Sequence, residues 1–257
     1  MSFNKNSRHV PAEMYDQSYY LNSMEGAYEF TNSGGQKLSY RLQYSINLAK
    51  IIPGERVLDI GCGRGEATLN CALRGAKSHG LDYSSAAMHI ARQLMGHARR
   101  NDMEMSVEQA HADQLPFLNN SFDKVFMLDI VEHLYQSELE RTFLEVYRIL
   151  KPGGNLVIHT MPNADYYRWG YPIYRLVMAI IGKKLPRDPR SRWYRGDTHV
   201  NIQNPRRLRQ ALIESGFSPV DVWIDALTDR SLVRTLLSIG PWRWVLLNDI
   251  LGIAVKP

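Results

Sequence analysis

The chain has 257 residues, and its 44% hydrophobic and 22% charged residues are typical of a globular protein that buries a substantial core. Two cysteines are too few for a disulfide-stapled scaffold, and no apolar run approaches the ~20 residues of a membrane-spanning helix, so we expect a cytoplasmic protein. The net charge of +5 is modest, and we expect no nucleic-acid partner.

Residues 1–35 are polar and rich in Asn, Ser and Tyr, and we expect them to form a mobile N-terminal arm. We expect the remainder, 36–257, to form a single domain. It opens with apolar residues at helical spacing over 38–49, after which strand-like and helix-like patterns alternate. This alternation predicts parallel strands joined by helical crossovers, an α/β fold. The predicted strands lie at 56–60, 77–81, 103–107, 122–128, 156–159, 220–224 and 250–255.

Residues 161–203 interrupt the alternation, and we expect them to form an inserted cap. The regular pattern resumes with a helix that has Asn204 as its cap, Pro205 at its first position and Gly216 at its end.

The stretch "VLDIGCGRGE", residues 57–66, leads from the first predicted strand into a glycine loop. Its glycines are one residue short of the dinucleotide spacing G-x-G-x-x-G, and Asp59 and Glu66 would repel a pyrophosphate. A ligand with an ammonium and a sulfonium group would be attracted instead, as S-adenosylmethionine (SAM) would be. Gly61 and Gly63 would let the backbone approach it, and Asp59 would orient the loop or the ammonium group. The alternatives are a dinucleotide site and a purely structural loop.

Two more acids follow predicted strands. Asp82, in "GLDYS", can accept both ribose hydroxyls of a nucleoside, with Tyr83 packed on the adenine. Asp113, in "HADQLPF", can accept the adenine amino hydrogens. Each acid alone is weak evidence, because an acid after a strand is more often a turn or helix cap. The ordered set of loop and two strand-end acids favours a nucleoside.

Together, "VLDIGCGRGE", "GLDYS", "HADQLPFLNNSFDKVFMLDIVEHL" and "EVYRILKPGGNLVI" resemble the class I SAM-dependent methyltransferases over residues 50–160. The resemblance implies a Rossmann-like, seven-stranded, mostly parallel sheet with helices on both faces and one antiparallel strand. It also implies SAM as cofactor and S-adenosylhomocysteine as product. A looser resemblance, through "HVNIQNPRRLRQALIESGF", links the chain to ubiquinone-biosynthesis O-methyltransferases. The expected cofactor-binding residues are Tyr20, Asp59, Gly61, Cys62, Gly63, Asp82, Tyr83, Ala112, Asp113, Gln114 and Asp129.

Methyl transfer to a hydroxyl requires a base, and His133, in "LDIVEHL", is the candidate catalytic residue. The alternative is that His133 only caps or packs against the next helix. We expect no metal, although similar E-x-x-E-H clusters of the ubiquinone branch are associated with a divalent ion, which makes Asp129, Glu132 and His133 an alternative ligand set. His159, Asp165 and His199 are further candidates for the acceptor pocket, or else structural polar residues.

We therefore predict a SAM-dependent methyltransferase that acts on an oxygen of a small-molecule, glycan or lipid-linked acceptor. N-methylation and a non-catalytic SAM-binding module are the alternatives, and the glycine spacing disfavours a nicotinamide oxidoreductase. The arm carries Tyr15, Tyr19 and Tyr20, which either close over the cofactor as a lid or leave a surface helix with one packed tyrosine.

The inserted cap contains "YPIYRLVMAII", followed by six basic residues between 183 and 195 and a single acid, Asp188. Apolar residues beside a basic cluster, with Trp169 and Trp193 at the flanks, are typical of a segment in a membrane interface. Residues 171–195 are thus expected to make peripheral membrane contact, or to form a lid that closes the acceptor pocket, or both.

Overall fold

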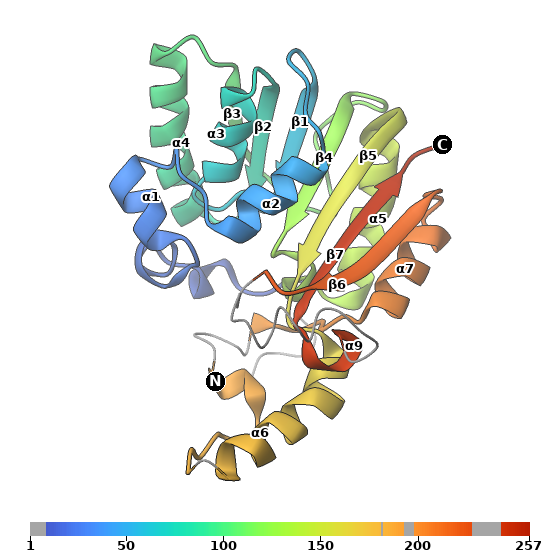
Figure 1. Ribbon diagram of the computed structural model, residues 1–257. Helices are drawn as coiled ribbons and strands as arrows, with labels where there is room; N and C mark the ends of the chain where they lie inside the picture. Colours follow the sequence, from blue (N-terminus) through green and yellow to red (C-terminus); the bar gives the residue numbers. More distant parts are fainter. Residues whose placement is uncertain (1–8, 181, 193–197, 228–242) are drawn as a thin grey trace.

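The computed structural model describes residues 9–180, 182–192, 198–227 and 243–257 (Figure 1). Its centre is a seven-stranded sheet in the order β3-β2-β1-β4-β5-β7-β6. β7 runs antiparallel to both of its neighbours, and every other pair is parallel. The strands are β1 Arg56–Ile60, β2 Lys77–Asp82, β3 Met105–Gln109, β4 Phe122–Leu128, β5 Leu150–Thr160, β6 Val220–Asp225 and β7 Asp249–Val255.

Helices cover both faces of this sheet, with α2, α3 and α4 on one side and α5 and α7 on the other (Figure 1). The helices of the body are α2 Tyr40–Leu48, α3 Glu66–Leu73, α4 Ser85–Arg100, α5 Gln136–Ile149, α7 Pro205–Glu214 and α9 Arg243–Leu246. The arm contributes η1 Ala12–Met14, η2 Tyr19–Ser23 and α1 Ala27–Ser33. The remaining short helices are η3 Val131–His133, η4 Tyr166–Gly170, α6 Tyr171–Ile180 and η5 Pro189–Arg192.

The central strands β1 and β4 are buried over most of their length because helices cover both faces of the sheet. In β1, Val57 packs into the cluster beneath α2, whereas the next residue, Leu58, packs into the larger core on the side of α5 and α7. The expected Rossmann-like sheet with one antiparallel strand is confirmed.

The starts of β3 and β5 differ most from the sequence prediction, and the other strand ends agree within one or two residues. β3 begins at Met105 rather than at 103, and β5 begins at Leu150 rather than at 156. The "KPGG" segment, residues 151–154, belongs to this strand, since Leu150 pairs with Phe122 across a register shift. A positive φ of 78° at Gly153 accommodates this irregularity.

The arm lies against the domain rather than apart from it. Val10, Tyr15, Tyr20 and Phe30 are buried in a cluster that also contains α3 and α4 side chains. The described part of the arm therefore contributes a wall to the carboxyl edge of the sheet.

The insertion leaves the body beside α9 and carries α6 away from the sheet (Figure 1). The start of the insertion packs closely against α9 at Gly170, because a Cβ at this position would collide with the carbonyl oxygen of Val245. No helix among the described residues is both long and apolar enough to cross a bilayer. Trp193 and Arg195, which the sequence pattern singled out, lie outside the described residues.

Gly170→Ala should destabilise the protein by roughly 1–3 kcal/mol, because the methyl group forces η4 and α9 apart. The matched control is Gly96→Ala in the middle of α4, where a Cβ meets only the far end of Arg100. This control should raise stability by about 0.5–1 kcal/mol through helix propensity. Urea unfolding of both variants measures the difference in the free energy of unfolding. Equal values for the two variants would contradict close packing at Gly170.

Candidate active site

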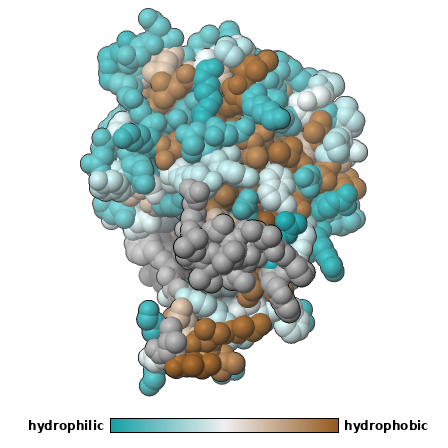
Figure 2. Space-filling model, viewed as in Figure 1, coloured by the Kyte–Doolittle hydropathy of each residue, from teal (hydrophilic) through white to brown (hydrophobic). Residues whose placement is uncertain are grey.

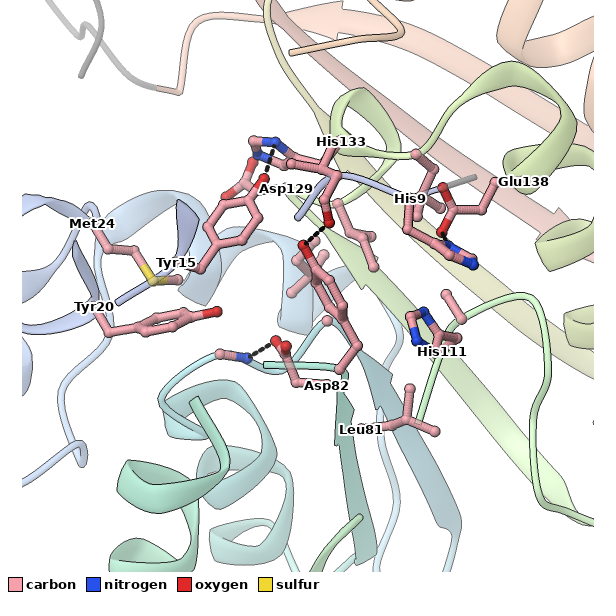
Figure 3. Close-up of a pocket in the computed structure, with 18 of the residues that line it drawn as sticks. His9, Tyr15, Tyr20, Met24, Leu81, Asp82, His111, Asp129, His133 and Glu138 are labelled. Carbon is pink, nitrogen blue, oxygen red and sulfur yellow. Dashed lines mark hydrogen bonds and ion pairs between the residues drawn. The ribbon is translucent and has the colours of Figure 1, made fainter. Parts of the chain in front are cut away.

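A cavity lies at the carboxyl edge of the parallel strands, which we call the strand-end cavity (Figure 3). The arm, the glycine loop, the end of β2, the loop after β3 and the segment after β4 all contribute to its wall. Carboxyl ends of parallel strands are where open α/β sheets bind ligands. The lining residues are His9, Val10, Tyr15, Tyr19, Tyr20, Met24, Gly61, Gly63, Leu81, Asp82, Tyr83, His111, Ala112, Leu128, Asp129, Ile130, His133, Leu134 and Glu138.

The glycine loop presents bare backbone to this cavity. Gly61 has a φ of 74°, and a Cβ on it would lie 2.7 Å from Cδ1 of Ile130. Gly63 has a φ of 52° and faces Tyr20 and Met24 of the arm. Any other residue at Gly61 would both strain the backbone and displace Ile130. The loop is thus built for close approach of a ligand.

Two backbone amides, one of them in the glycine loop, hold the Asp82 carboxylate in place. Its Oδ2 accepts a hydrogen bond from the Gly63 amide at 3.0 Å, and its Oδ1 accepts one from the Ser84 amide at 2.9 Å. Burial raises the pKa of Asp82 to about 6, so the group is mainly a carboxylate at neutral pH. Each oxygen keeps a second lone pair for a ribose hydroxyl. The neighbouring Tyr83 lines the cavity and donates its hydroxyl proton to the Val10 carbonyl at 3.0 Å.

Asp59 and Cys62 lie beneath the loop and outside the cavity wall. Asp59 accepts a hydrogen bond from Thr68 Oγ1 at 2.8 Å, and burial raises its pKa to about 7. The Cys62 side chain points toward Gly80, where a Cβ would lie 2.9 Å from its sulfur. Of the two roles foreseen for Asp59, this position favours orientation of the loop.

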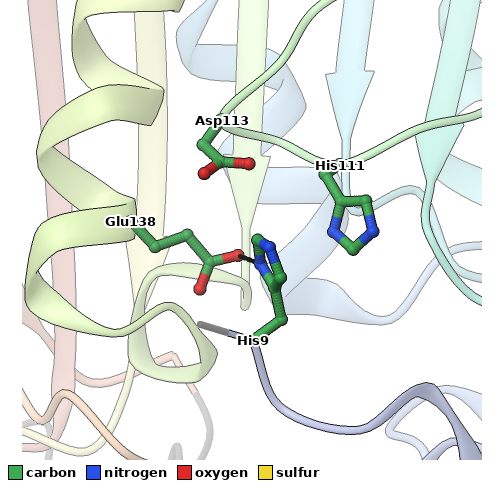
Figure 4. Close-up of side chains that lie close together, drawn as sticks. All are labelled: His9, His111, Asp113 and Glu138. Atoms are coloured by element: carbon green, nitrogen blue, oxygen red, sulfur yellow. Dashed lines mark hydrogen bonds and ion pairs between the residues drawn. The ribbon is translucent and has the colours of Figure 1, made fainter. Parts of the chain in front are cut away.

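The far end of the cavity is formed by the loop after β3 and by His9 of the arm (Figure 4). Asp113 Oδ2 accepts two hydrogen bonds from Arg141, at 2.7 and 2.9 Å, whereas Oδ1 is buried without a hydrogen-bond partner. An orphaned buried carboxylate oxygen fits the amino group of an adenine. Ala112 lines the cavity, whereas Asp113 lies behind the lining residues and the exposed Gln114 lies outside the wall.

His9 closes this end by contacting two neighbours. Its Nδ1 lies 2.6 Å from Glu138 Oε1, and its ring packs on that of His111 with centroids 4.2 Å apart. Sequence reasoning missed His9, because a histidine in a polar terminal segment carries no local signal of its partners.

Asp129, at the opposite end of the cavity, belongs to a buried charge network. It pairs with Arg41 at 2.8 Å and with His159 at 2.5 Å, and Arg41 also pairs with Glu25 of the arm at 2.7 Å. His159 contacts Asp249 at 3.2 Å through its other nitrogen. Burial by itself would favour the uncharged forms of Asp129 and His159. The nearby positive charges of Arg41 and His159 nevertheless hold the pKa of Asp129 well below its usual range. The same pairing overcomes the effect of burial on His159 and raises its pKa to about 9.

His133 lies between the arm and the loop at 198–201. Its Nδ1 is 3.2 Å from the Thr198 carbonyl and 2.9 Å from the Tyr15 hydroxyl. A carbonyl can only accept, so the tautomer that makes this contact carries its proton on Nδ1 and leaves Nε2 as the acceptor. Burial, followed by the neighbouring His199, lowers the pKa of His133 to about 3. The imidazole is therefore neutral throughout the physiological range.

The alternative metal set of Asp129, Glu132 and His133 is not gathered around one point. Asp129 faces Arg41 and His159, and Glu132 accepts a hydrogen bond from Thr160 at 2.7 Å. The structure instead brings Glu132 and His133 together with His199, with ligand atoms within 4.8 Å of one another. His159 belongs to the charge network, and Asp165 accepts a hydrogen bond from Asn204 at 3.3 Å.

The arm is fastened by Arg64, which sequence reasoning also missed. This fully buried side chain donates to the Tyr20 carbonyl at 3.0 Å and to the Glu25 carbonyl at 2.7 Å, and it forms an ion pair with Glu66. Its guanidinium lies over the Phe30 ring, 4.7 Å from the centroid. An arginine within a glycine loop is a signal that could have been read, because a ligand-facing loop has little room for a long side chain.

Comparisons with known proteins agree with this geometry. A family model described as a methyltransferase domain matches residues 58–158. The demethylmenaquinone methyltransferase of Oceanobacillus iheyensis is 30% identical over 178 residues, 66% of this chain and 72% of that protein. The ubiquinone/menaquinone biosynthesis C-methyltransferase UbiE of Neisseria meningitidis is 26% identical over 185 residues, 69% and 73% of the two chains. Among solved structures, Haemonchus contortus phosphoethanolamine N-methyltransferase 2 in complex with SAM has a TM-score of 0.64 at 18% identity, covering 99% of this chain and 61% of its own.

Asp82→Ala should weaken SAM binding by roughly 2 kcal/mol, about 30-fold in Kd, because two ribose hydroxyls lose their acceptor. Isothermal titration calorimetry measures the loss, and thermal melting checks the fold. The matched control Asp221→Ala removes an exposed acid on β6 and should bind SAM as the wild type does. Wild-type affinity in Asp82→Ala would contradict this placement of the ribose.

The raised pKa of His159 should make the free energy of unfolding depend on pH between neutral and alkaline values. The folded state keeps a proton up to about pH 9, whereas an ordinary histidine releases it near 6.5. The free energy of unfolding should therefore fall as pH rises from about 6.5 to 9, by up to about 3 kcal/mol. Denaturant unfolding of His159→Gln should show a flatter profile over this window, and an unchanged slope would contradict the protonated network.

Proposed function

The chain belongs to the class I SAM-dependent methyltransferases, and we propose that it methylates a hydroxyl oxygen of an apolar, hydroxylated small molecule. Bound SAM supplies an electrophilic methyl group on its sulfonium. The observation that carries the proposal is the neutral His133 in the wall of the strand-end cavity, with one ring nitrogen held by the Thr198 carbonyl.

His133 would accept the acceptor's hydroxyl proton as the methyl group is transferred. An imidazole with a pKa of about 3 is too weak a base to form a free phenolate beforehand. Proton removal is therefore expected within the transition state, when methyl transfer is already making the hydroxyl acidic. Glu132, whose pKa burial raises to about 7, lies beside the ring and would stabilise the imidazolium in its ionised form.

The apolar side chains in the cavity wall support an apolar acceptor. Tyr15, Tyr19, Leu128, Ile130 and Leu134 line the cavity near His133, and no described lining residue is a lysine or arginine. A phosphate-bearing acceptor would lack the cationic partners that such groups ordinarily receive. The wall therefore disfavours a phosphorylated amine as the acceptor. If the protein methylates nitrogen, the acceptor would be an uncharged or apolar amine.

Transfer to carbon is a second candidate, favoured by the Neisseria relative that is named a C-methyltransferase. Removing a phenolic proton also makes the adjacent ring carbon nucleophilic. The same base would thus serve a quinol that is methylated on its ring, and the choice between oxygen and carbon depends on how the acceptor is oriented.

Replacing His133 by Ala should lower turnover on the order of 100-fold while leaving SAM affinity nearly unchanged. Release of S-adenosylhomocysteine from SAM measures turnover, with a catechol and a 1,4-naphthoquinol as acceptors. Proton NMR of the product separates methoxy from ring-methyl groups. The matched control is His89→Ala, an exposed histidine on α4, which should leave turnover unchanged.

Near-normal turnover of His133→Ala would return this residue to a packing role. If neither phenolic acceptor yields S-adenosylhomocysteine, the proposed acceptor class is wrong. Loss of activity on addition of a chelator, restored by a divalent ion, would instead favour metal binding at Glu132, His133 and His199.

A further inference from the structure

One face of α6 is apolar and exposed to solvent. Trp169, Ile173, Leu176, Val177 and Ile180 recur at the spacing of a single helical face, and their exposed fractions range from 51% to 78%. Figure 2 shows a hydrophobic surface on the projecting part of the molecule that contains α6. Exposed apolar groups scattered singly are ordinary, whereas a contiguous stripe on one helix indicates a binding surface.

The N-terminal end of α6 fixes the helix to the rest of the molecule. Tyr171 is buried at its root, and the Tyr171 hydroxyl donates to the Pro186 carbonyl at 2.9 Å. Gly170 packs against the Val245 carbonyl in α9. The helix is therefore held with a defined orientation, and its apolar stripe faces outward.

A basic turn follows the helix directly. The Lys183 amide donates to the Met178 carbonyl at 2.8 Å, which folds the turn onto the end of α6. Within 182–192, Arg190 pairs with Asp188, whereas no ion pair found among the described residues includes Lys183, Lys184 or Arg187. All three side chains are exposed. The turn thus places uncompensated positive charge beside the apolar stripe.

We infer that α6 and this basic turn dock on an anionic phospholipid membrane, with the apolar stripe in the interface and the lysines at the headgroups. An apolar helical face followed directly by a cluster of Lys and Arg is typical of a segment that lies in a membrane interface, and the flanking Trp169 fits that location. A protein partner with an apolar groove would match the stripe but would not require the basic turn. The charge therefore selects an anionic surface.

The functional reason for membrane docking rests on the proposed function, because an apolar acceptor partitions into membranes. α6 projects from the carboxyl edge of the sheet, the same edge that carries the strand-end cavity (Figure 1). Docking through α6 would therefore bring that end of the molecule to the bilayer that holds the acceptor.

Vesicle co-sedimentation tests the inference without any methyl transfer. The probes are phosphatidylcholine vesicles with and without phosphatidylglycerol, at low and high salt. Wild type should sediment with the anionic vesicles at low salt and be released at high salt. The double variant Lys183→Glu/Lys184→Glu should bind at least about 30-fold more weakly, since each basic residue near an anionic surface contributes about a fivefold effect.

A matched charge control is Arg99→Glu/Arg100→Glu at the distal end of α4, where both residues are exposed. This variant has the same change of net charge and should bind as the wild type does. The apolar stripe is tested by Leu176→Ser/Ile180→Ser, and Leu118→Ser/Leu144→Ser is its control, because all four side chains are exposed. The first pair should lose vesicle binding and the second should retain it.

Wild type that stays in the supernatant with anionic vesicles overturns the inference, as does equal weakening by Arg99→Glu/Arg100→Glu. A dimer in analytical ultracentrifugation that Leu176→Ser/Ile180→Ser dissolves would assign the stripe to a second copy of the chain and also overturn it. Turnover with a water-soluble catechol is measured in parallel. Its absence counts against the proposed function, whereas vesicle binding is read independently of it.

Discussion

The buried ion pair between Arg41 and Asp129 joins three parts of the molecule that the active site needs. Arg41 lies in α2, Asp129 follows β4, and Glu25 of the arm pairs with the same guanidinium. Removing one member of such a pair typically costs ~3–5 kcal/mol, because the other charge is left buried. His159 adds a second cation on the other side of Asp129. The carboxylate is thereby ionised and held in the wall of the strand-end cavity.

Close packing imposes the second constraint on the site. The backbone of Gly61 meets Ile130 on one side of the cavity, and Gly63 meets Tyr20 and Met24 of the arm on the other. Arg64 then binds two carbonyl groups of the arm from within the same loop. The glycine loop therefore has two functions: its backbone faces the ligand, and its one long side chain keeps the arm over the cavity. A covered cavity excludes water, which strengthens each electrostatic contact inside it.

Asp129 and His133 lie about one helical turn apart along the chain, yet they differ in charge. Asp129, with Arg41 and His159 beside it, stays ionised, whereas His133 stays neutral. The difference arises from their neighbours, since opposite charges surround Asp129 and aromatic rings with His199 surround His133. The same part of the cavity wall therefore carries a fixed negative charge and an uncharged imidazole. The exposed apolar stripe of α6 lies at the same edge of the sheet, on the outside of the molecule.

The sequence by itself determined what depends on local chemistry. Alternating apolar runs predicted the strands, Asn204 was recognised as a cap that the structure confirms, and the glycine loop with Asp82 pointed to a nucleoside. Only the tertiary structure brought together Arg41, Asp129, His159 and Asp249, which come from four separate elements, because contacts between distant segments leave no periodic pattern. It also showed that α6 is buried only at its first residue, Tyr171. An apolar helix in the sequence becomes an exposed apolar surface only once its packing partners are known.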